Sequence, residues 1–99
     1  MLPETAQLDE RAEDLDATMG VYPNPGNGQY AIVYAESEQP VTQWSVFDEL
    51  GRKVEGFQAT NLNGTHYELV FGTTLANGLY YIHWMADGEL KSVRWMVSR

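Results

Sequence analysis

The chain has no cysteine, little positive charge and no long apolar run. Its 99 residues without cysteine exclude a disulfide framework, a thiolate zinc site and a thiol nucleophile. Only six Lys and Arg stand against 14 Asp and Glu, a formal net charge of −8. This balance argues against nucleic acid and anionic membrane surfaces as partners, because both favour Lys and Arg. Since no apolar segment approaches the ~20 residues that span a bilayer, we also expect no direct membrane insertion.

Catalytic signatures are equally scarce, and the length allows only one domain, because domains commonly run to about 100–150 residues. His66 and His83 are the only two histidines, and neither has the spacing of a metal or catalytic motif. His66 and Glu68 share a strand face, which an ordinary solvated surface explains. No serine has a nearby base, and no glycine-rich phosphate loop opens a helix. We therefore predict that the chain is not an enzyme and binds no metal or cofactor.

Charge and aromatic residues divide the chain near residue 19. Residues 1–18 contain six acids and one base, a net charge of −5, whereas residues 19–99 contain eight acids and five bases, a net charge of −3. All aromatic residues fall between Tyr22 and Trp95. The first segment is too polar to offset its ordering entropy, and it does not match a secretory signal. We predict a flexible acidic linker over residues 1–19 and a folded body over residues 20–99.

From Gly20 onward, apolar and polar residues alternate with period two, which is typical of antiparallel strands with one buried face. Asn-Gly pairs at 27–28, 63–64 and 77–78 and Asp87-Gly88 indicate turns between the strands. The expected strands are Gln29–Ala35, Thr42–Asp48, Thr65–Phe71, Leu79–Ala86 and Ser92–Val97, with shorter candidates at Val21-Tyr22 and Arg52–Thr60. The pattern predicts an all-β fold, a small antiparallel immunoglobulin-like β-sandwich of six to seven strands.

Three sequence blocks and a basic last strand carry a resemblance to a known family. The blocks read VYPNPGNG over residues 21–28, WSVFDELGRKV over residues 44–54 and LANGLYYI over residues 75–82. Each block alone is weak, but their order and spacing extend over the whole predicted body. Together they resemble the type A C-terminal sorting domain of the Bacteroidota type IX secretion system, the Por secretion system family.

The resemblance implies a function as a detachable export tag at the end of a larger precursor. Such a tag directs the upstream cargo domain across the outer membrane and is recognised by outer-membrane components of the type IX translocon. A sortase-like cysteine protease then usually removes the tag, and the cleaved bond is expected within residues 1–20. A domain that is retained for signalling stays open as the alternative. The resemblance further implies a fragment of a precursor that passes through the periplasm to the outer-membrane surface or the extracellular space. The sequence predicts neither the cargo nor an oligomeric state.

The resemblance also assigns recognition residues to each block: Pro23, Asn24, Pro25 and Gly28; Asp48, Gly51 and Arg52; Gly78 and Tyr80; and the basic Lys91, Arg94 and Arg99. A structural explanation stands beside each assignment. The first block is equally typical of a strand-entry turn. In the second block, the aspartate can accept backbone N–H groups while its glycine takes a positive φ, and the arginine either pairs with that carboxylate or faces a partner. The third block indicates a tight turn and a buried ring.

The last strand departs from the family pattern at two positions. Val93 stands where a basic residue is common, and Trp95 stands where an aliphatic residue is usual. If the translocon recognises charge on this strand, the contact is expected to depend on Lys91, Arg94 and Arg99.

Two alternative functions stay open from the residues alone. Trp44, Tyr81, Trp84 and Trp95 could form a stacking platform for carbohydrate, although their alternating positions favour a role in the core. An immunoglobulin-like module for protein interaction or signalling at the cell surface is the other alternative. In either case, an exposed edge strand could pair with a second copy or a translocon subunit.

Overall fold

The computed structural model describes residues 20–99, which contain seven strands and no helix. The strands are β1 (Val21–Tyr22), β2 (Tyr30–Tyr34), β3 (Trp44–Asp48), β4 (Phe57–Asn61), β5 (His66–Phe71), β6 (Gly78–Ala86) and β7 (Glu89–Val97). Within this range no helix has the length and apolar content needed to cross a membrane. The predicted linker over residues 1–19 and its cleavage region lie outside the described residues.

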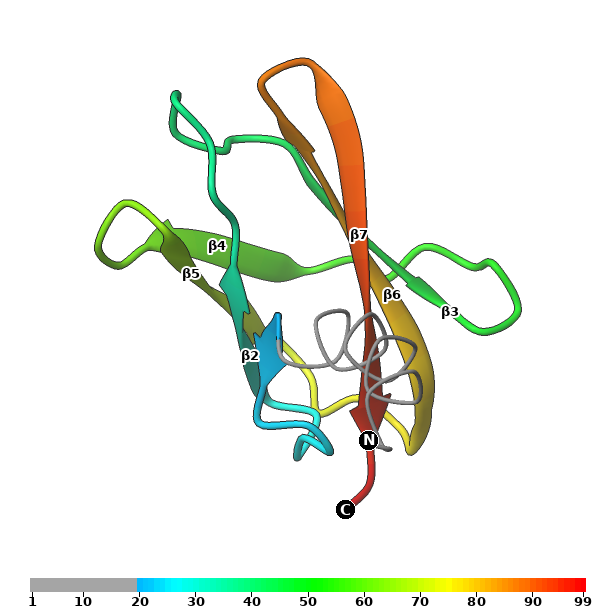
Figure 1. The fold of residues 1–99 in the computed structure, drawn as a ribbon. Helices are drawn as coiled ribbons and strands as arrows, with labels where there is room; N and C mark the ends of the chain where they lie inside the picture. Colours follow the sequence, from blue (N-terminus) through cyan, green and yellow to red (C-terminus); the bar gives the residue numbers. More distant parts are fainter. Residues whose placement is uncertain (1–19) are drawn as a thin grey trace, which may run out of the picture.

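The strands form two antiparallel sheets that face each other across a shared core (Figure 1). One sheet has the order β1-β2-β5-β4, and the other has the order β3-β6-β7. The predicted all-β antiparallel sandwich is therefore confirmed, including the two short strand candidates at its margins.

Two strands begin three or more residues away from the predicted position, whereas the other boundaries differ by at most two residues. The candidate over Arg52–Thr60 forms a strand only from Phe57, because a positive φ of 76° at Gly56 turns the chain just before it. β7 begins at Glu89 instead of Ser92. Positive φ angles at both Asp87 and Gly88 form a two-residue turn, so that β6 and β7 pair directly after it. The first three residues of β7 are all exposed, so they show no alternation of buried and exposed positions that would predict a strand.

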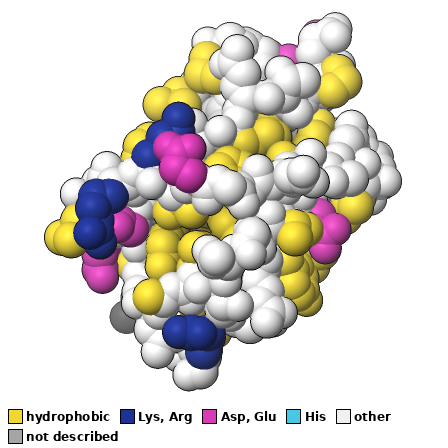
Figure 2. Space-filling model, turned by 180° about the vertical axis from the view of Figure 1, so that it is seen from behind, with side chains coloured by type: hydrophobic (Ala, Val, Ile, Leu, Met, Phe, Trp, Pro, Cys, Tyr) yellow, Lys and Arg dark blue, Asp and Glu magenta, His cyan; other side chains and the backbone are white. Residues whose placement is uncertain are grey.

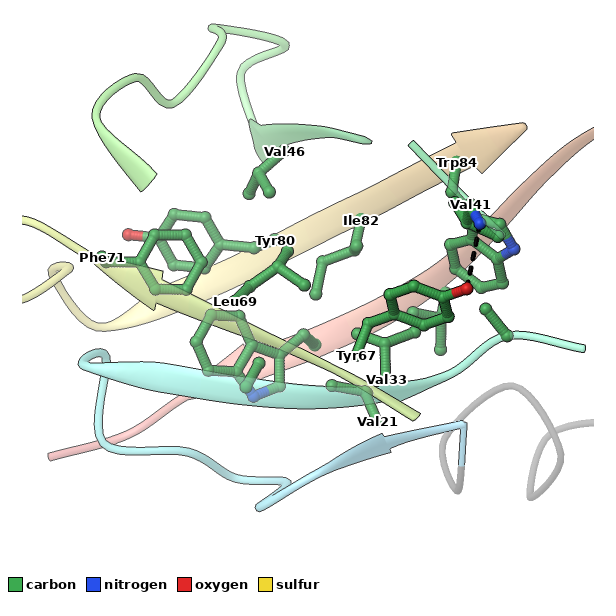
Figure 3. Packing of buried hydrophobic residues seen from close by; sticks show 14 of the residues in the cluster. Val21, Val33, Val41, Val46, Tyr67, Leu69, Phe71, Tyr80, Ile82 and Trp84 are labelled. Carbon is green, nitrogen blue, oxygen red and sulfur yellow. Dashed lines mark hydrogen bonds between the residues drawn. The ribbon is translucent and has the colours of Figure 1, made fainter. Parts of the chain in front are cut away.

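Large side chains from both sheets fill the core (Figure 3). Trp95, Tyr67, Leu69, Ile82 and Val33 are the largest contributors that are almost completely buried. The Phe71 and Trp95 rings stack across the two sheets, with ring centroids 5.5 Å apart. No polar or charged residue is buried among residues 20–99. Apolar burial therefore stabilises the sandwich, as a small domain without disulfides requires.

Candidate functional site

The residues assigned to the motif blocks gather around one end of the sandwich, which we call the motif end. It consists of residues 23–28, 48–52, 75–80 and 94–99. In Figure 1 the β1–β2 loop, the β5–β6 connection and the C-terminus lie together at the bottom of the view, with the β3–β4 turn beside them.

The first block is joined to the last strand by backbone and side-chain hydrogen bonds. The Trp95 indole N–H donates to the Pro23 carbonyl oxygen over 2.8 Å. The Gly26 N–H donates to the Met96 carbonyl oxygen over 2.8 Å, and the Ser98 N–H donates to the Gly26 carbonyl oxygen over 3.0 Å. A Cβ at Gly26 would lie 2.7 Å from the Trp95 ring, so only glycine fits there. This loop therefore covers the free edge of the last part of β7.

Two further residues of the first block have defined structural roles. The Asn24 side-chain oxygen accepts the Met96 N–H over 3.1 Å, which extends the cover on β7. Gly28 has a φ of 82°, and its carbonyl oxygen accepts the Leu75 N–H over 2.9 Å. A Cβ at Gly28 would lie 2.7 Å from the Leu75 carbonyl oxygen. The block thus forms the loop between β1 and β2, and it fixes the β5–β6 connection in place.

The second block forms a turn around the Asp48 carboxylate. Its Oδ1 accepts the backbone N–H groups of Leu50 and Arg52, each over 2.9 Å, and its Oδ2 accepts the Arg52 Nε–H over 2.8 Å. The Arg52 backbone N–H is the main cause that lowers the pKa of Asp48. Desolvation opposes it, and the Arg52 side chain and the Leu50 N–H lower the pKa further. Gly51 takes the expected positive φ of 84°. Arg52 pairs with Asp48, as one of the two expectations held, and its side chain is 74% exposed.

The third block lies directly beside the second. Tyr80 is paired with Asp48 in the β3–β6 register, and its ring is buried as predicted. The Tyr80 hydroxyl donates to the Ala76 carbonyl oxygen over 2.7 Å. Burial raises the pKa of the Tyr80 phenol, and the negative charge of Asp48 raises it further. A small cavity of about 130 Å³ between the Asp48–Arg52 turn and residues 76–80 separates the two blocks.

The three basic residues of the last strand do not form one patch. Lys91 lies on the same face of β7 as the buried Trp95, and its ammonium pairs with Glu89 over 3.1 Å. Arg94 is exposed on the opposite face. Arg99 lies beyond the end of β7, about 26 Å from Lys91 at the usual rise of ~3.3 Å per strand residue. Figure 2 likewise shows Lys and Arg side chains as separate groups on the rear face.

Arg94 is a basic residue that shares a cavity with the first block. It lines a shallow cavity of about 270 Å³ on the outer face of β6 and β7, together with Asn24, Leu79 and Met96. This cavity places a side chain of the first block beside a basic side chain of the last strand. The charged, planar guanidinium of Arg94 and the exposed thioether of Met96 therefore line the same cavity.

Sequence reasoning missed two residues that hold the motif end together. For Trp95 the sequence favoured a role in the core and a departure from an aliphatic pattern, but it did not predict the indole N–H bond to Pro23. Asn77 was interpreted only as half of an Asn-Gly turn, yet its side-chain oxygen accepts the Arg99 N–H over 2.8 Å. In the sequence, an asparagine before a glycine is only a weak indication that its side chain accepts a backbone N–H from a distant residue.

The aromatic residues do not form the carbohydrate platform considered above. Trp95 and Trp84 are buried in the core, whereas Tyr81 lies on the outer face of the same sheet. Across residues 20–99 no group of three or more His, Cys, Asp or Glu side chains is placed to hold a metal ion.

Comparison with known proteins identifies the family. The family model described as the secretion system C-terminal sorting domain matches residues 20–98. No curated protein and no solved structure matches the chain. The match starts where the described fold starts and includes all three blocks and the last strand. The family is not known for enzymatic activity. The chain therefore belongs to the secretion system C-terminal sorting domains, and it carries a type IX secretion signal for export to the cell surface or extracellular space.

Proposed function

We propose that residues 20–99 act as a type A sorting domain of a Bacteroidota precursor and that the outer-membrane translocon docks on the motif end. The observation that carries this proposal is the set of hydrogen bonds between residues 23–26 and residues 95–98. These bonds fix the first block against the last strand, so a partner meets both as one preformed surface. Preformed surfaces lose less conformational entropy on binding than flexible ones.

The chemistry of this surface favours a partner with a carboxylate beside an apolar group. Arg94 offers a planar guanidinium that can bind a carboxylate with two hydrogen bonds. Met96, which is 42% exposed, and Leu79 provide the apolar part of the same cavity. Arg52 and Arg99 lie farther along the motif end and extend the positive charge. Lys91 faces away from this cavity and is already paired with Glu89.

The processing step of the proposal places the cleaved bond within residues 1–20, ahead of β1. The Tyr34 N–H donates to the Gly20 carbonyl oxygen over 2.8 Å, so the chain is part of the sheet from that residue onward. Proteases bind substrates as accessible extended chain, which paired strands do not offer. A sortase-like cysteine protease acting after transit through the periplasm would release the cargo and leave the sandwich intact.

An export assay tests the proposal. The full 99-residue chain is appended to a periplasm-targeted reporter in a type IX-competent host, and reporter is measured at the surface, in the medium and in the periplasm. We expect export in this host and periplasmic retention in a matched host without the translocon. A folded reporter that stays in the periplasm of the competent host contradicts the proposal.

A second variant tests the role of the last strand. Deletion of Trp95–Arg99 is expected to abolish export, because it removes the partner of the 23–26 loop. Since the deletion also removes core side chains, circular dichroism must accompany it. The point variant Arg94→Gln keeps the core and tests the surface alone.

A further inference from the structure

No described strand closes the side of the sandwich between β3 and β4. Ala59 and Asn61 of β4 are paired with Leu69 and Tyr67 of β5, so their side chains point to the same face as these two buried residues. Nevertheless, Ala59 and Asn61 are both exposed. β4 therefore extends past the three-stranded sheet, and no described strand covers its inner face.

The backbone of β4 is also open at this edge. The hydrogen bonds from Leu62 to His66 and from Gly72 to Gly56 flank the β4–β5 ladder and set its alternation. By that alternation, Gln58 and Thr60 turn their backbone groups to β5, whereas Phe57, Ala59 and Asn61 turn theirs outward. No described residue pairs with these outward N–H and C=O groups. Such an edge is a template for one more strand.

A cavity of about 510 Å³ lies between this edge and β3. Its walls include Val41, Trp44, Phe57, Ala59, Asn61 and Tyr67, and none of its lining residues is charged. The rest of the gap is closed by the chain itself, because the Val54 N–H donates to the Val46 carbonyl oxygen over 2.7 Å. The open part is therefore limited to the half that faces Trp44.

Hydrogen-bond donors without acceptors lie in the wall of this cavity and directly behind it. The indole N–H groups of Trp44 and Trp84 are buried and have no partner among residues 20–99. The two rings are in contact, with centroids 5.5 Å apart. The Tyr67 hydroxyl accepts the Val41 N–H over 2.9 Å, which leaves its own proton to donate (Figure 3). Buried donors normally have partners, so this group calls for acceptor oxygens from outside.

We propose that the cleft between β3 and β4 binds an extended, uncharged peptide segment of a partner protein, which adds a strand to β4. The open backbone edge selects an extended main chain, and its carbonyl groups are acceptors that a partner could bring to Trp44, which lines the cavity. The uncharged apolar walls select an aliphatic or aromatic side chain, since a charge there would be buried without a counter-ion. A second copy paired through its own β4 fits less well, because the one large apolar side chain of that strand, Phe57, is already packed against its own core. This site lies at the end of the sandwich away from Arg94, so it is independent of the motif end.

The test uses the ¹⁵N-labelled full chain and capped heptapeptides in which Thr alternates with Val, Ile or Phe. We expect at least one peptide to shift the indole N–H resonances of Trp44 and Trp84. The Trp95 indole, which is already bonded to Pro23, is an internal control and should not move. Amide exchange at Ala59 should slow by about tenfold or more, because its outward N–H gains a partner.

Matched variants separate binding from folding. Ala59→Pro removes the outward N–H at a position where an edge strand tolerates proline, and it should abolish the shifts. Gln58→Ala changes an exposed residue whose N–H faces β5, and it should leave them unchanged. Trp44→Phe keeps the ring but removes one orphan donor, so it should weaken peptide binding while the melting temperature stays equal or rises.

Three results would overturn the proposal. The first is no indole shift with any of the three peptides, or equal shifts in Ala59→Pro. The second is a concentration-dependent shift without peptide, which would assign the cleft to a second copy. The third is an Ala59 amide that is already protected in the dilute chain alone, which would show that the chain covers its own edge.

Discussion

The indole N–H of Trp95 donates to the carbonyl oxygen of Pro23, although the two residues are 72 positions apart in the chain. This contact joins the loop after the first strand to the last part of β7. It also places a tryptophan, which is a departure from the aliphatic pattern that the resemblance implies, in a role that an aliphatic residue cannot fill. The motif end of this chain is therefore held by a side-chain bond in addition to backbone pairing.

The first prediction concerns this bond. Trp95→Phe keeps a ring against Phe71 but removes the donor, and it should lower the free energy of unfolding by about 1–3 kcal/mol because the Pro23 oxygen loses its partner. Trp95→Ala should cost about 3–5 kcal/mol, since it also leaves a cavity. Urea denaturation measures both, with the exposed Met96→Ala as control. A Phe variant as stable as the native chain would show that the bond contributes nothing.

A pair of glycines provides the second prediction. Gly28 and Gly51 have nearly equal positive φ angles, 82° and 84°, but only Gly28 has a neighbour within reach of an added Cβ. Gly51→Ala should therefore cost only the backbone term of roughly 1–2 kcal/mol. Gly28→Ala should cost about 1–3 kcal/mol more, because its methyl group would press on the Leu75 carbonyl. Equal melting temperatures for the two variants would contradict this account of the β5–β6 connection.

The third prediction is a pH dependence at Asp48. Because its hydrogen bonds lower the folded-state pKa, this carboxylate stabilises the fold above its unfolded pKa of about 3.9. That contribution is lost as the pH falls from there through the lower folded-state pKa. Asp48→Asn should therefore melt earlier than the native chain at pH 7, and the difference should shrink in acid. Glu55→Gln removes one exposed charge near the same turn and should show no such convergence.

The fourth prediction compares two basic residues on opposite faces of β7. Binding hot spots, among which arginine is enriched, cost about 2 kcal/mol or more when truncated, so Arg94→Gln should weaken translocon docking by about 30-fold if Arg94 is such a hot spot. Lys91→Gln should leave docking and export near the native level. Neither surface change should alter the free energy of unfolding by more than about 0.5 kcal/mol. Equal losses of export would indicate that the translocon recognises the net charge of the strand, not one face of it.

Local patterns predicted most of the architecture. Alternation identified the inward faces of β5, β6 and β7, and the turn around Asp48 followed from the chemistry of aspartate and glycine. Contacts between distant residues were beyond reach, since no period in the sequence links Pro23 to Trp95. The boundaries of β4 were wrong because only Phe57 and Ala59 in that strand are apolar. β4 needs few apolar side chains because no described strand faces its inner side. The cleft is open for the same reason.

The loop over residues 23–26 takes its shape from groups that are synthesised some 70 residues later. A chain that stops early, or is clipped ahead of β7, presents this loop without its partner. A receptor that binds only the folded loop would therefore bind only chains that have been translated through the last strand. If the translocon docks on this loop, as proposed, export would be withheld from a precursor that lacks the last strand.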